Sequence, residues 1–414
     1  MKDAPSPPAS TQTLREINRS LVLSTIHSQG PITRADVARV SRLSVPTVAN
    51  LVRGLLEEEL VVETGLQESG GGRPSALLEI NHENLFLIGV ELGETGITTL
   101  VTNTGLEEKA LRITAIDEGE NRPDAIISAI ATSVRSALSE ANVHAGKVLG
   151  IGIGIPGLVD SDKGISVFAP NWGWHDVDVK ARVEAALGIT TYVDNGAKVM
   201  VLGERWCGAG QGSDNVIALI VGTGLGAGVT IDGRIFRGAT ESAAEWGHMR
   251  INIDGPRCSC GSNGCLEAYC GAHAIARRAR ESLAATPEGS ALKKIGDLDH
   301  LTASDVIAAA MSGDRLALRL LEETGEYLGA GIANLVNLFN PEVVIIGGWV
   351  GIEAGEIMLP AIKVAVKESA LEFPLRSTRI VISELADRAI VIGAATVVLD
   401  KFLQPPKIRS VVSL

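Results

Sequence analysis

EWGHMRINIDGPRCSCGSNGCLE, residues 245–267, holds one histidine and three cysteines at the spacing of a small metal-binding loop. The thiols follow a C-x-C-x4-C pattern with glycines inside it, so that a short loop can wrap a single ion. The chain has only five cysteines in 414 residues, and three of them fall within eight positions. A closed set of four thiolate and imidazole ligands is typical of structural zinc. The stretch therefore predicts one structural Zn2+ bound by His248, Cys258, Cys260 and Cys265; the alternative is three reduced thiols in a glycine-rich loop.

Length and composition indicate two or three domains of α/β type. The chain is too long for one ordinary core, and its low aromatic content (3%) and 46 glycines favour α/β packing rich in small residues. No run of about twenty apolar residues offers a membrane span, and the first ten residues, MKDAPSPPAS, lack the apolar core of a signal peptide. The clustered cysteines, with two others that have no evident partner, indicate a reducing cytoplasm, which is the expected location.

The net charge of −12 argues against broad electrostatic binding to nucleic acid. One short stretch is an exception. Residues 34–53 contain four arginines (34, 39, 42 and 53) against one aspartate (36), a local net charge of +3. A local DNA-binding surface therefore remains possible within an acidic chain.

Residues 1–82 predict an α+β winged helix-turn-helix domain. Apolar residues at helical spacing between Leu14 and Ile26 give a first helix, Thr33 is placed to cap a second, and Ser44 to cap a third. The alternating stretch 60–80, interrupted by SGGGRP at 69–74, predicts a two-stranded wing. The alternative is a small helical module that binds protein.

The third helix of this domain is the expected DNA-recognition helix. Four of its residues lie on or near the predicted exposed side and are expected to meet the major groove: Ser44, Thr47, Asn50 and Arg53. Arg73, at the tip of the wing, is expected to enter a narrow A·T-rich minor groove. A single winged helix gives little specificity, so we expect a homodimer, or a tetramer, on a two-fold DNA operator.

The rest of the chain predicts a duplicated α/β architecture. Residues 85–105 and 216–235 share one plan of strand, glycine turn and strand, about 130 residues apart, which suggests two halves with a cleft between them. Residues 148–160 and 333–348 each contain a buried strand that ends at glycine, where α/β folds bind ligands. Helices are expected at 124–140, 266–284, 315–339 and 390–403.

Together these residues resemble the ROK family of repressors and sugar kinases, over nearly the whole chain. The most specific motif is Glu245-x-x-His248 followed by C-x-C-G-x-x-G-C-x-E, which ends at Glu267. A winged helix-turn-helix ending in GGGRP resembles the transcriptional-regulator branch. The resemblance implies an actin-like, hexokinase-like two-lobed α/β domain. Its small lobe is expected at 83–195 plus 390–414, and its large lobe, with the zinc site, at 196–389.

The resemblance also implies a sugar site shaped by the zinc loop. The matching sugar contacts are Gly157 (through its backbone), Asn171, Asn195, Glu245, His248 and Glu267. Carboxylates accept hydrogen bonds from vicinal hydroxyls, and asparagine both donates and accepts. A zinc-bound imidazole keeps its second nitrogen as a directed donor. In the alternative, Glu245 and Glu267 only support the zinc ligands.

The chain departs from the kinase pattern of this family at the catalytic base. The kinases carry an N-D-A-N-like run shortly before L-G-E, whose aspartate deprotonates the sugar hydroxyl. Counted back from residues 202–204, the corresponding position is Gly196. Glycine accepts no proton, and loss of a general base typically costs about 10²–10⁴-fold in rate. Asp194, two residues earlier, is the one alternative base.

The phosphate-binding loops depart from the kinase pattern as well. The pattern D-x-G-G-T-K corresponds to residues 91–96, where Glu94 replaces a glycine and Gly96 replaces the lysine. The second loop, 222–228, is intact, but Trp349 stands at a position that is often glycine. The chain is therefore expected to be no enzyme, with no catalytic residues, but a sugar-responsive DNA-binding repressor. The alternative is an active ATP-dependent sugar kinase with an attached DNA-binding domain.

Overall fold

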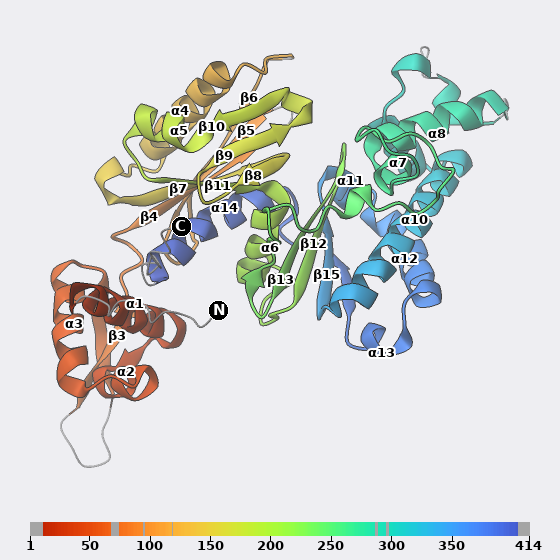
Figure 1. Ribbon diagram of the computed structural model, residues 1–414. Coiled ribbons are helices and arrows are strands. Elements are labelled where there is room, and N and C mark those ends of the chain that lie inside the picture. Colours follow the sequence, from red (N-terminus) through yellow and green to blue (C-terminus); the bar gives the residue numbers. More distant parts are fainter. Residues whose placement is uncertain are drawn as a thin grey trace, which may run out of the picture.

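The structure is a computed structural model that describes residues 11–67, 74–93, 96–117, 119–285, 289–294 and 298–404. It has three parts: a small head at the N-terminal end and two α/β lobes, each built on a five-stranded sheet. Figure 1 shows the head beside the first lobe and the second lobe beyond it. The expected fold class, a two-lobed α/β domain preceded by an α+β head, is confirmed.

The head contains the three helices and the wing that the sequence predicts. Its elements are α1 (Thr11–Gln29), α2 (Arg34–Ser41), α3 (Val45–Glu57), β2 (Val61–Gln67) and β3 (Ser75–Ile80). Thr33 caps α2 by accepting a hydrogen bond from the Asp36 amide, and Ser44 caps α3 by accepting one from the Thr47 amide. A short strand that the sequence did not indicate, β1 (Ile32–Thr33), pairs with β3 and ties the start of α2 to the wing.

The first lobe is built on a sheet of order β11-β7-β4-β5-β6. Its strands are β4 (Phe86–Leu92), β5 (Gly96–Asn103), β6 (Glu108–Ala115), β7 (Val148–Ile155) and β11 (Thr191–Asn195). Strands β4, β5 and β6 are antiparallel, whereas β4, β7 and β11 are parallel. Helices α4 (Pro123–Glu140) and α5 (Val179–Leu187) cover one face. A small sheet, β8 (Leu158–Asp160), β9 (Ile165–Ala169) and β10 (Trp174–Asp178), follows β7.

The second lobe repeats this plan. Its sheet has the order β14-β13-β12-β15-β16, again with an antiparallel meander on one side of the first strand and parallel strands on the other. The strands are β12 (Val216–Val221), β13 (Leu225–Ile231), β14 (Arg234–Ile235), β15 (Val343–Gly347) and β16 (Arg379–Ile382). The outer helices include α8 (Ala272–Ala285), α9 (Ala303–Met311), α10 (Arg315–Phe339) and α12 (Gly355–Ser369). The predicted duplication is confirmed.

Two helices, α6 (Gly196–Cys207) and α14 (Ala389–Leu403), lie between the sheets. Helix α14 packs on β4 and β7 of the first sheet, α6 packs on β12 and β13 of the second, and the two helices pack on each other. Strand alternation explains this layering. In β4, Ile88 and Val90 belong to the cluster with α4, whereas Leu87 belongs to the cluster with α14.

Glycines let α14 approach its neighbours at backbone distance. A Cβ on Gly152 of β7 would lie 1.8 Å from the carbonyl oxygen of Ala394, and one on Gly393 of α14 would lie 1.8 Å from the carbonyl oxygen of Val199 in α6. No side chain fits at either contact. The two sheets and the two central helices are therefore held at fixed spacing.

The segment 266–284, predicted as one helix, is broken into α7 (Glu267–Cys270) and α8. The break falls at Gly271, where a Cβ would lie 2.9 Å from the Thr223 carbonyl oxygen. Close packing against the loop after β12 therefore interrupts the helix.

The division into residues 1–82, 83–195 plus 390–414, and 196–389 stays a prediction. The wing tip also stays a prediction, because residues 68–73 lie outside those described. Within the described part of the chain, no helix combines the length and the apolar character that crossing a membrane requires.

We expect Gly152→Ala to destabilise the first lobe by at least about 2 kcal/mol, because the added methyl group has no space against α14. Gly54→Ala in α3 is the matched control, since a Cβ there meets no described atom within 4 Å. It should stabilise the head by about 0.5–1 kcal/mol. Scanning calorimetry measures both effects. Equal melting temperatures for Gly152→Ala and the wild type would contradict the proposed backbone contact.

Candidate functional site

The predicted metal ligands converge on one point. The donor atoms of His248, Cys258, Cys260 and Cys265 all lie within 4.8 Å of one another. The Cys260 and Cys265 sulfurs are 3.7 Å apart, and the Cys258 sulfur is 3.7 Å from His248 Nδ1. Two thiolates at about 2.3 Å from one tetrahedral zinc ion would be about 3.8 Å apart, so the spacing of Cys260 and Cys265 fits such an ion.

The loop that presents these ligands is folded by its own backbone. The Cys258 amide donates to the Ser262 carbonyl (2.8 Å), which closes a tight turn around Cys260. Gly264 has φ +70°, and a Cβ there would lie 1.6 Å from the Asn252 carbonyl oxygen, so only glycine is accommodated. These turns direct three thiols toward His248 from a single short segment.

Glu267, at the start of α7, connects the loop that carries the three cysteines (residues 258–265, the candidate metal loop) to the second sheet. Its Oε1 accepts a hydrogen bond from the Ser259 hydroxyl (3.0 Å) and lies 3.7 Å from the Cys258 sulfur. Its Oε2 accepts one from the Leu225 amide at the start of β13 (3.0 Å). The carboxylate therefore fixes the position of the loop as well as offering acceptors at its surface.

Glu245 precedes and His248 ends a short 3-10 turn, η3 (Trp246–His248), which is anchored by the buried indole of Trp246. The Glu245 and His248 side chains are both exposed. The surrounding protein nevertheless raises the pKa of Glu245 through desolvation, while the charges of His248 and Lys198 oppose this rise. Glu245 is thus an accessible carboxylate close to the metal loop.

Asn195 and Gly157 are in direct contact on the first lobe. The Asn195 side chain caps α6 by accepting hydrogen bonds from the amides of Ala197 and Lys198, and it donates to the Gly157 carbonyl oxygen (2.8 Å). Gly157 has φ +84° and packs against the end of β9, two residues before Asn171. The structure thus brings Gly157 and Asn195 together, with Asn171 exposed on a turn two residues after the end of β9. Glu245 interacts electrostatically with Lys198, whose amide Asn195 caps, and with His248 and Glu267.

A buried ion cluster that the sequence did not indicate lies beside Asn195. Asp194, only 2% exposed, receives two hydrogen bonds from the Arg237 guanidinium (2.6 and 3.2 Å). Arg237 also donates to Glu241 (2.7 Å), whose other donor is the Ser161 hydroxyl (3.0 Å). Burial lowers the pKa of Arg237, but hydrogen bonds and charge from Asp194 and Glu241 outweigh this and raise it. The pairing holds Asp194 as an engaged carboxylate.

Lys198, on the first turn of α6, completes this cluster. Its side chain is buried and its ammonium donates to the Glu241 carbonyl oxygen. Burial lowers the Lys198 pKa, and the neighbouring Asp194 opposes that shift. The cluster joins Asp194 and Lys198 to Arg237 and Glu241, about 40 residues later in the chain. Apart from the charges themselves, the sequence carries no signal for such a distant pairing.

Gly196, which the sequence analysis predicts at the position of the kinase base, begins α6 beside Asn195. A Cβ on Gly196 would meet Ile155 O at 3.7 Å and Ile390 Cδ1 at 3.8 Å, both ordinary contact distances. Packing around the Cβ position therefore does not require glycine.

The structure describes all of the second predicted phosphate loop (222–228) but only part of the first (91–96). Glu94 lies outside the described residues, so its effect on the first loop stays a prediction. At the start of that loop, burial and the nearby Asp387 raise the pKa of Glu91 to about 7. In the second loop, a Cβ on Gly222 would lie 3.1 Å from Trp349 Cδ1, so the indole rests against the loop. Trp349 begins the short helix α11 (Trp349–Glu353).

The predicted DNA-contacting residues lie at the start and along one side of α3. Asn50 and Arg53 are exposed, one helical turn apart. Ser44 and Thr47 are hydrogen-bonded to each other through their hydroxyls (2.8 Å) at the helix N-terminus. Val45 beside them is an apolar side chain, 56% exposed, that the sequence analysis did not single out. Arg73 lies outside the described residues.

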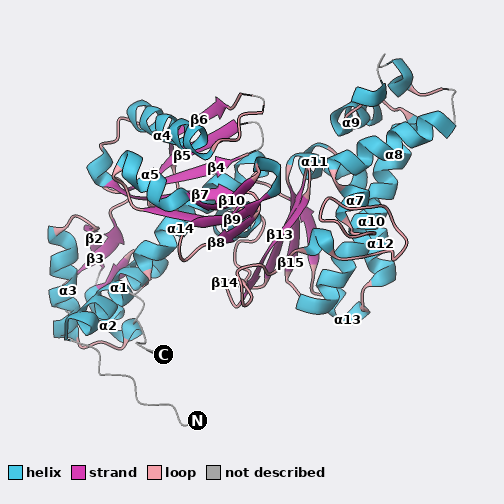
Figure 2. Cartoon of the chain, turned by 45° about the horizontal axis from the view of Figure 1, so that its top comes forward, coloured by secondary structure: helices cyan, strands magenta, loops and turns pink. Residues whose placement is uncertain are grey.

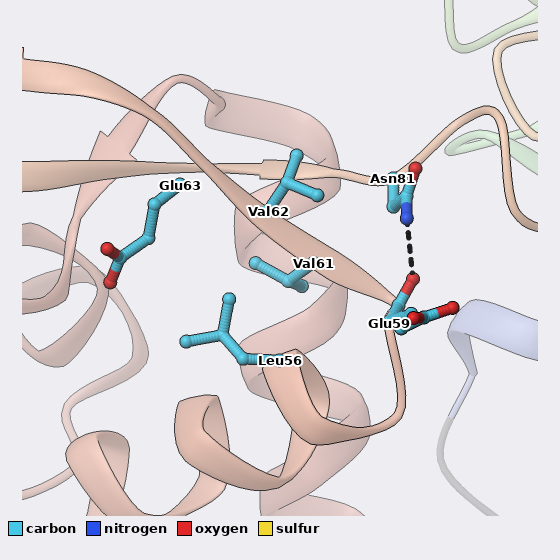
Figure 3. Close-up of a pocket in the computed structure, with 6 residues that line it drawn as sticks. All are labelled: Leu56, Glu59, Val61, Val62, Glu63 and Asn81. Carbon is cyan, nitrogen blue, oxygen red and sulfur yellow. Dashed lines mark hydrogen bonds between the residues drawn. The ribbon is translucent and has the colours of Figure 1, made fainter.

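The head also has an open depression, shown in Figure 3, between the end of α3 and β2. Its lining residues are Leu56, Glu59, Val61, Val62, Glu63 and Asn81. Glu59 and Glu63 give it an acidic rim, which is unsuited to a phosphate backbone. Asn81 Nδ2 donates to the Glu59 carbonyl oxygen there (3.0 Å), so this side of the head holds the chain that leads into the first lobe.

Comparison with known proteins gives matches for the two α/β lobes and for the chain as a whole. The family model described as "ROK family" matches residues 87–401. A "Putative xylose repressor" of Caldicellulosiruptor sp. (strain Rt8B.4) is 34% identical, and the alignment covers 95% of this chain and 98% of that protein. A "Glucokinase" of Thermotoga maritima is also 34% identical, but over 77% of this chain and 98% of its own length.

Among solved structures, a ROK family transcriptional regulator, a homologue of the E. coli MLC protein, superimposes with a TM-score of 0.82. It is 30% identical and covers 94% of this chain and 97% of its own. The repressor matches thus include the head, whereas the glucokinase match leaves out a segment of the size of the head.

Proposed function

The chain belongs to the ROK family, and from this membership we propose that it is a DNA-binding transcriptional repressor that responds to a sugar. One observation carries the proposal. The relatives that match this chain along nearly its whole length, head included, are named as repressors or transcriptional regulators. The exposed Asn50 and Arg53 on a capped α3 support a DNA-reading role for the head. The partner is a DNA operator bound by a homodimer or tetramer.

The proposed sugar site comprises Gly157, Asn171, Asn195, Glu245, His248 and Glu267. His248 Nδ1 faces the Cys258 sulfur, so Nε2 is the nitrogen left to carry the proton and donate to a sugar hydroxyl. Glu267 already accepts from Ser259 and Leu225, and a carboxylate has about four acceptor sites, so some of its capacity remains. Relatives named for xylose make D-xylose the first effector to test.

We propose that the cluster of His248, Cys258, Cys260 and Cys265 holds a structural zinc ion. The distances between the donor atoms and the absence of a carboxylate among the four support zinc over harder cations. When bound, the ion supplies cross-linking of the loop and polarises the His248 ring. Glu267 then holds the loop against β13, and His248 presents its second nitrogen to the sugar.

We further propose that the ROK domain binds sugar without phosphorylating it. Gly196 cannot accept a proton, and Asp194, the alternative base, is buried against Arg237. A Glu91 with a pKa of about 7 is half protonated at neutral pH, and a protonated carboxyl is a poor ligand for a nucleotide-bound cation. Trp349 against Gly222 occupies space beside the second phosphate loop. Four independent features thus oppose phosphoryl transfer.

We expect the purified protein to contain about one zinc ion per chain. Cys265→Ser should lose it, because the site then has three ligands around a buried position. Cys207→Ser, on α6 and outside the cluster, is the matched control and should retain the metal. Plasma mass spectrometry measures the zinc content, and a thermal melt with and without chelator measures its effect on stability. Metal-free wild-type protein from zinc-supplemented growth would overturn the assignment.

The central test of the proposed function is binding to DNA from upstream of the protein's own gene. We expect Asn50→Ala with Arg53→Ala to weaken specific binding by about tenfold to hundredfold, because base contacts in the major groove are lost. Arg376→Ala, at an exposed arginine that follows α13 (Glu372–Leu375), should leave binding unchanged. Fluorescence anisotropy at two salt concentrations measures both variants. Wild-type protein that shows no salt-dependent DNA binding would instead favour a protein-binding head.

The rival function is an active sugar kinase. We expect no sugar-dependent ADP release by the wild type with ATP and D-xylose, D-glucose or N-acetyl-D-glucosamine. Gly196→Asp, whose Cβ meets only ordinary contacts, should also stay inactive, because Trp349 and Glu91 are unchanged. A coupled assay with the Thermotoga glucokinase as positive control measures this. Turnover by the wild type would establish the kinase, and turnover by Gly196→Asp alone would show that only the base is missing.

A further inference from the structure

Contacts at the linker, at the end of α14 and near the end of α1 join the DNA-binding head to the first lobe and the central helices. The linker is held on both sides, since Asn81 donates to Glu59 of the head and Lys147 of the lobe donates to Asn84 (3.0 Å). The last turn of α14 places Phe402 and Leu403 against the apolar core of the head. His27, near the end of α1, packs edge-on against Trp206 of α6, with ring centroids 5.5 Å apart.

Helix α6 therefore has the proposed sugar site at one end and the head at the other. Asn195 caps its N-terminus and also holds the Gly157 carbonyl. Trp206 is the penultimate residue of the same helix, about 16 Å further along its axis. A rigid rod of three turns thus separates a proposed sugar contact from a side chain that contacts the DNA-binding head.

Helix α14 is in direct backbone contact with α6 at two glycines. A Cβ on Gly203 of α6 would lie 2.3 Å from the Ala389 carbonyl, and the Gly393 contact with Val199 is closer still. Trp206 itself packs on the apolar cluster that contains Ala394 and Val397 of α14. Close-packed interiors transmit displacement rather than absorb it. Figures 1 and 2 both show α14 running from between the two sheets to the head.

We propose that the α6–α14 pair relays sugar binding to the DNA-binding head, and that the Trp206–His27 contact is the point of transfer. This inference rests on the proposed function and names how the same sugar site is regulated. Sugar held by Asn195 shifts the cap of α6. The shift moves Trp206 against α1 and moves the α14 end with it, because the two helices share backbone contacts. The head then changes its orientation to the operator.

The experiment compares DNA affinity with and without sugar in the wild type and in Trp206→Ala. D-xylose, D-glucose and N-acetyl-D-glucosamine are the probes, and the sugar with the largest effect on the wild type is carried forward. An effector of this kind changes affinity by about tenfold to hundredfold. In Trp206→Ala we expect this ratio to fall below about threefold, while calorimetry gives an unchanged sugar affinity and anisotropy gives an unchanged affinity for DNA alone.

His27→Ala removes the same contact from the head side, so it tests the relay even if Trp206→Ala fails to fold. The double variant should lose no more coupling than either single variant, because each single substitution removes the same Trp206–His27 contact. Trp206→Phe should restore most of the ratio, and Phe373→Ala, an aromatic on α13 that is 84% exposed, should leave it at the wild-type value. Full coupling in both Trp206→Ala and His27→Ala overturns the relay alone. A wild type whose DNA affinity no sugar changes overturns the proposed function, and the relay with it.

Discussion

The contact of α14 with bare backbone on both sides is the constraint on which the rest of the structure depends. At Gly152 of β7 and Gly393 of α14 no side chain fits, so at these points the helix lies at carbonyl distance from the first sheet and from α6. This spacing positions the second sheet, since α6 packs on β12 and β13. It also fixes the start of α6, where Asn195 meets Gly157, and the end of α14, where Phe402 contacts the head. One close-packed layer thus sets the geometry of the proposed sugar site and of the head together.

The residues proposed to hold the sugar differ in accessibility from the residues near the predicted base position. Of the proposed sugar contacts, Glu245 and His248 are exposed, and Glu267 is fixed by Ser259 and Leu225. Near the predicted base position, Gly196, lies a partly buried ion cluster. Asp194 and Glu241 share Arg237, a two-carboxylate arrangement whose stability depends on keeping all three groups paired. An aspartate committed in this way cannot also take a proton from a substrate without leaving the arginine unpaired.

Local features of this chain could be predicted from sequence, and features that depend on distant segments could not. The caps at Thr33 and Ser44, the two meanders and the four metal ligands each arise from short-range spacing, and the structure reproduces them. The Asp194–Arg237 pair joins residues 43 apart, and the Trp206–His27 contact joins two separate domains. No periodicity records such pairings, because they are set by how sheets and helices pack. The helix break at Gly271 has the same origin, since the Thr223 carbonyl that requires the glycine belongs to another loop.

A sugar-kinase scaffold suits a sensor because both tasks require a site that distinguishes two conformations of the protein. An effector that binds one conformation tenfold to hundredfold more tightly supplies about 1.4–2.7 kcal/mol, which is enough to shift a balanced equilibrium. Catalysis would undermine that use, because turnover consumes the effector and replaces it with a product of different charge. A glycine at the predicted base position, Gly196, agrees with such a use, because glycine accepts no proton. The ion pair with Arg237 engages Asp194, the other candidate base, in a structural contact.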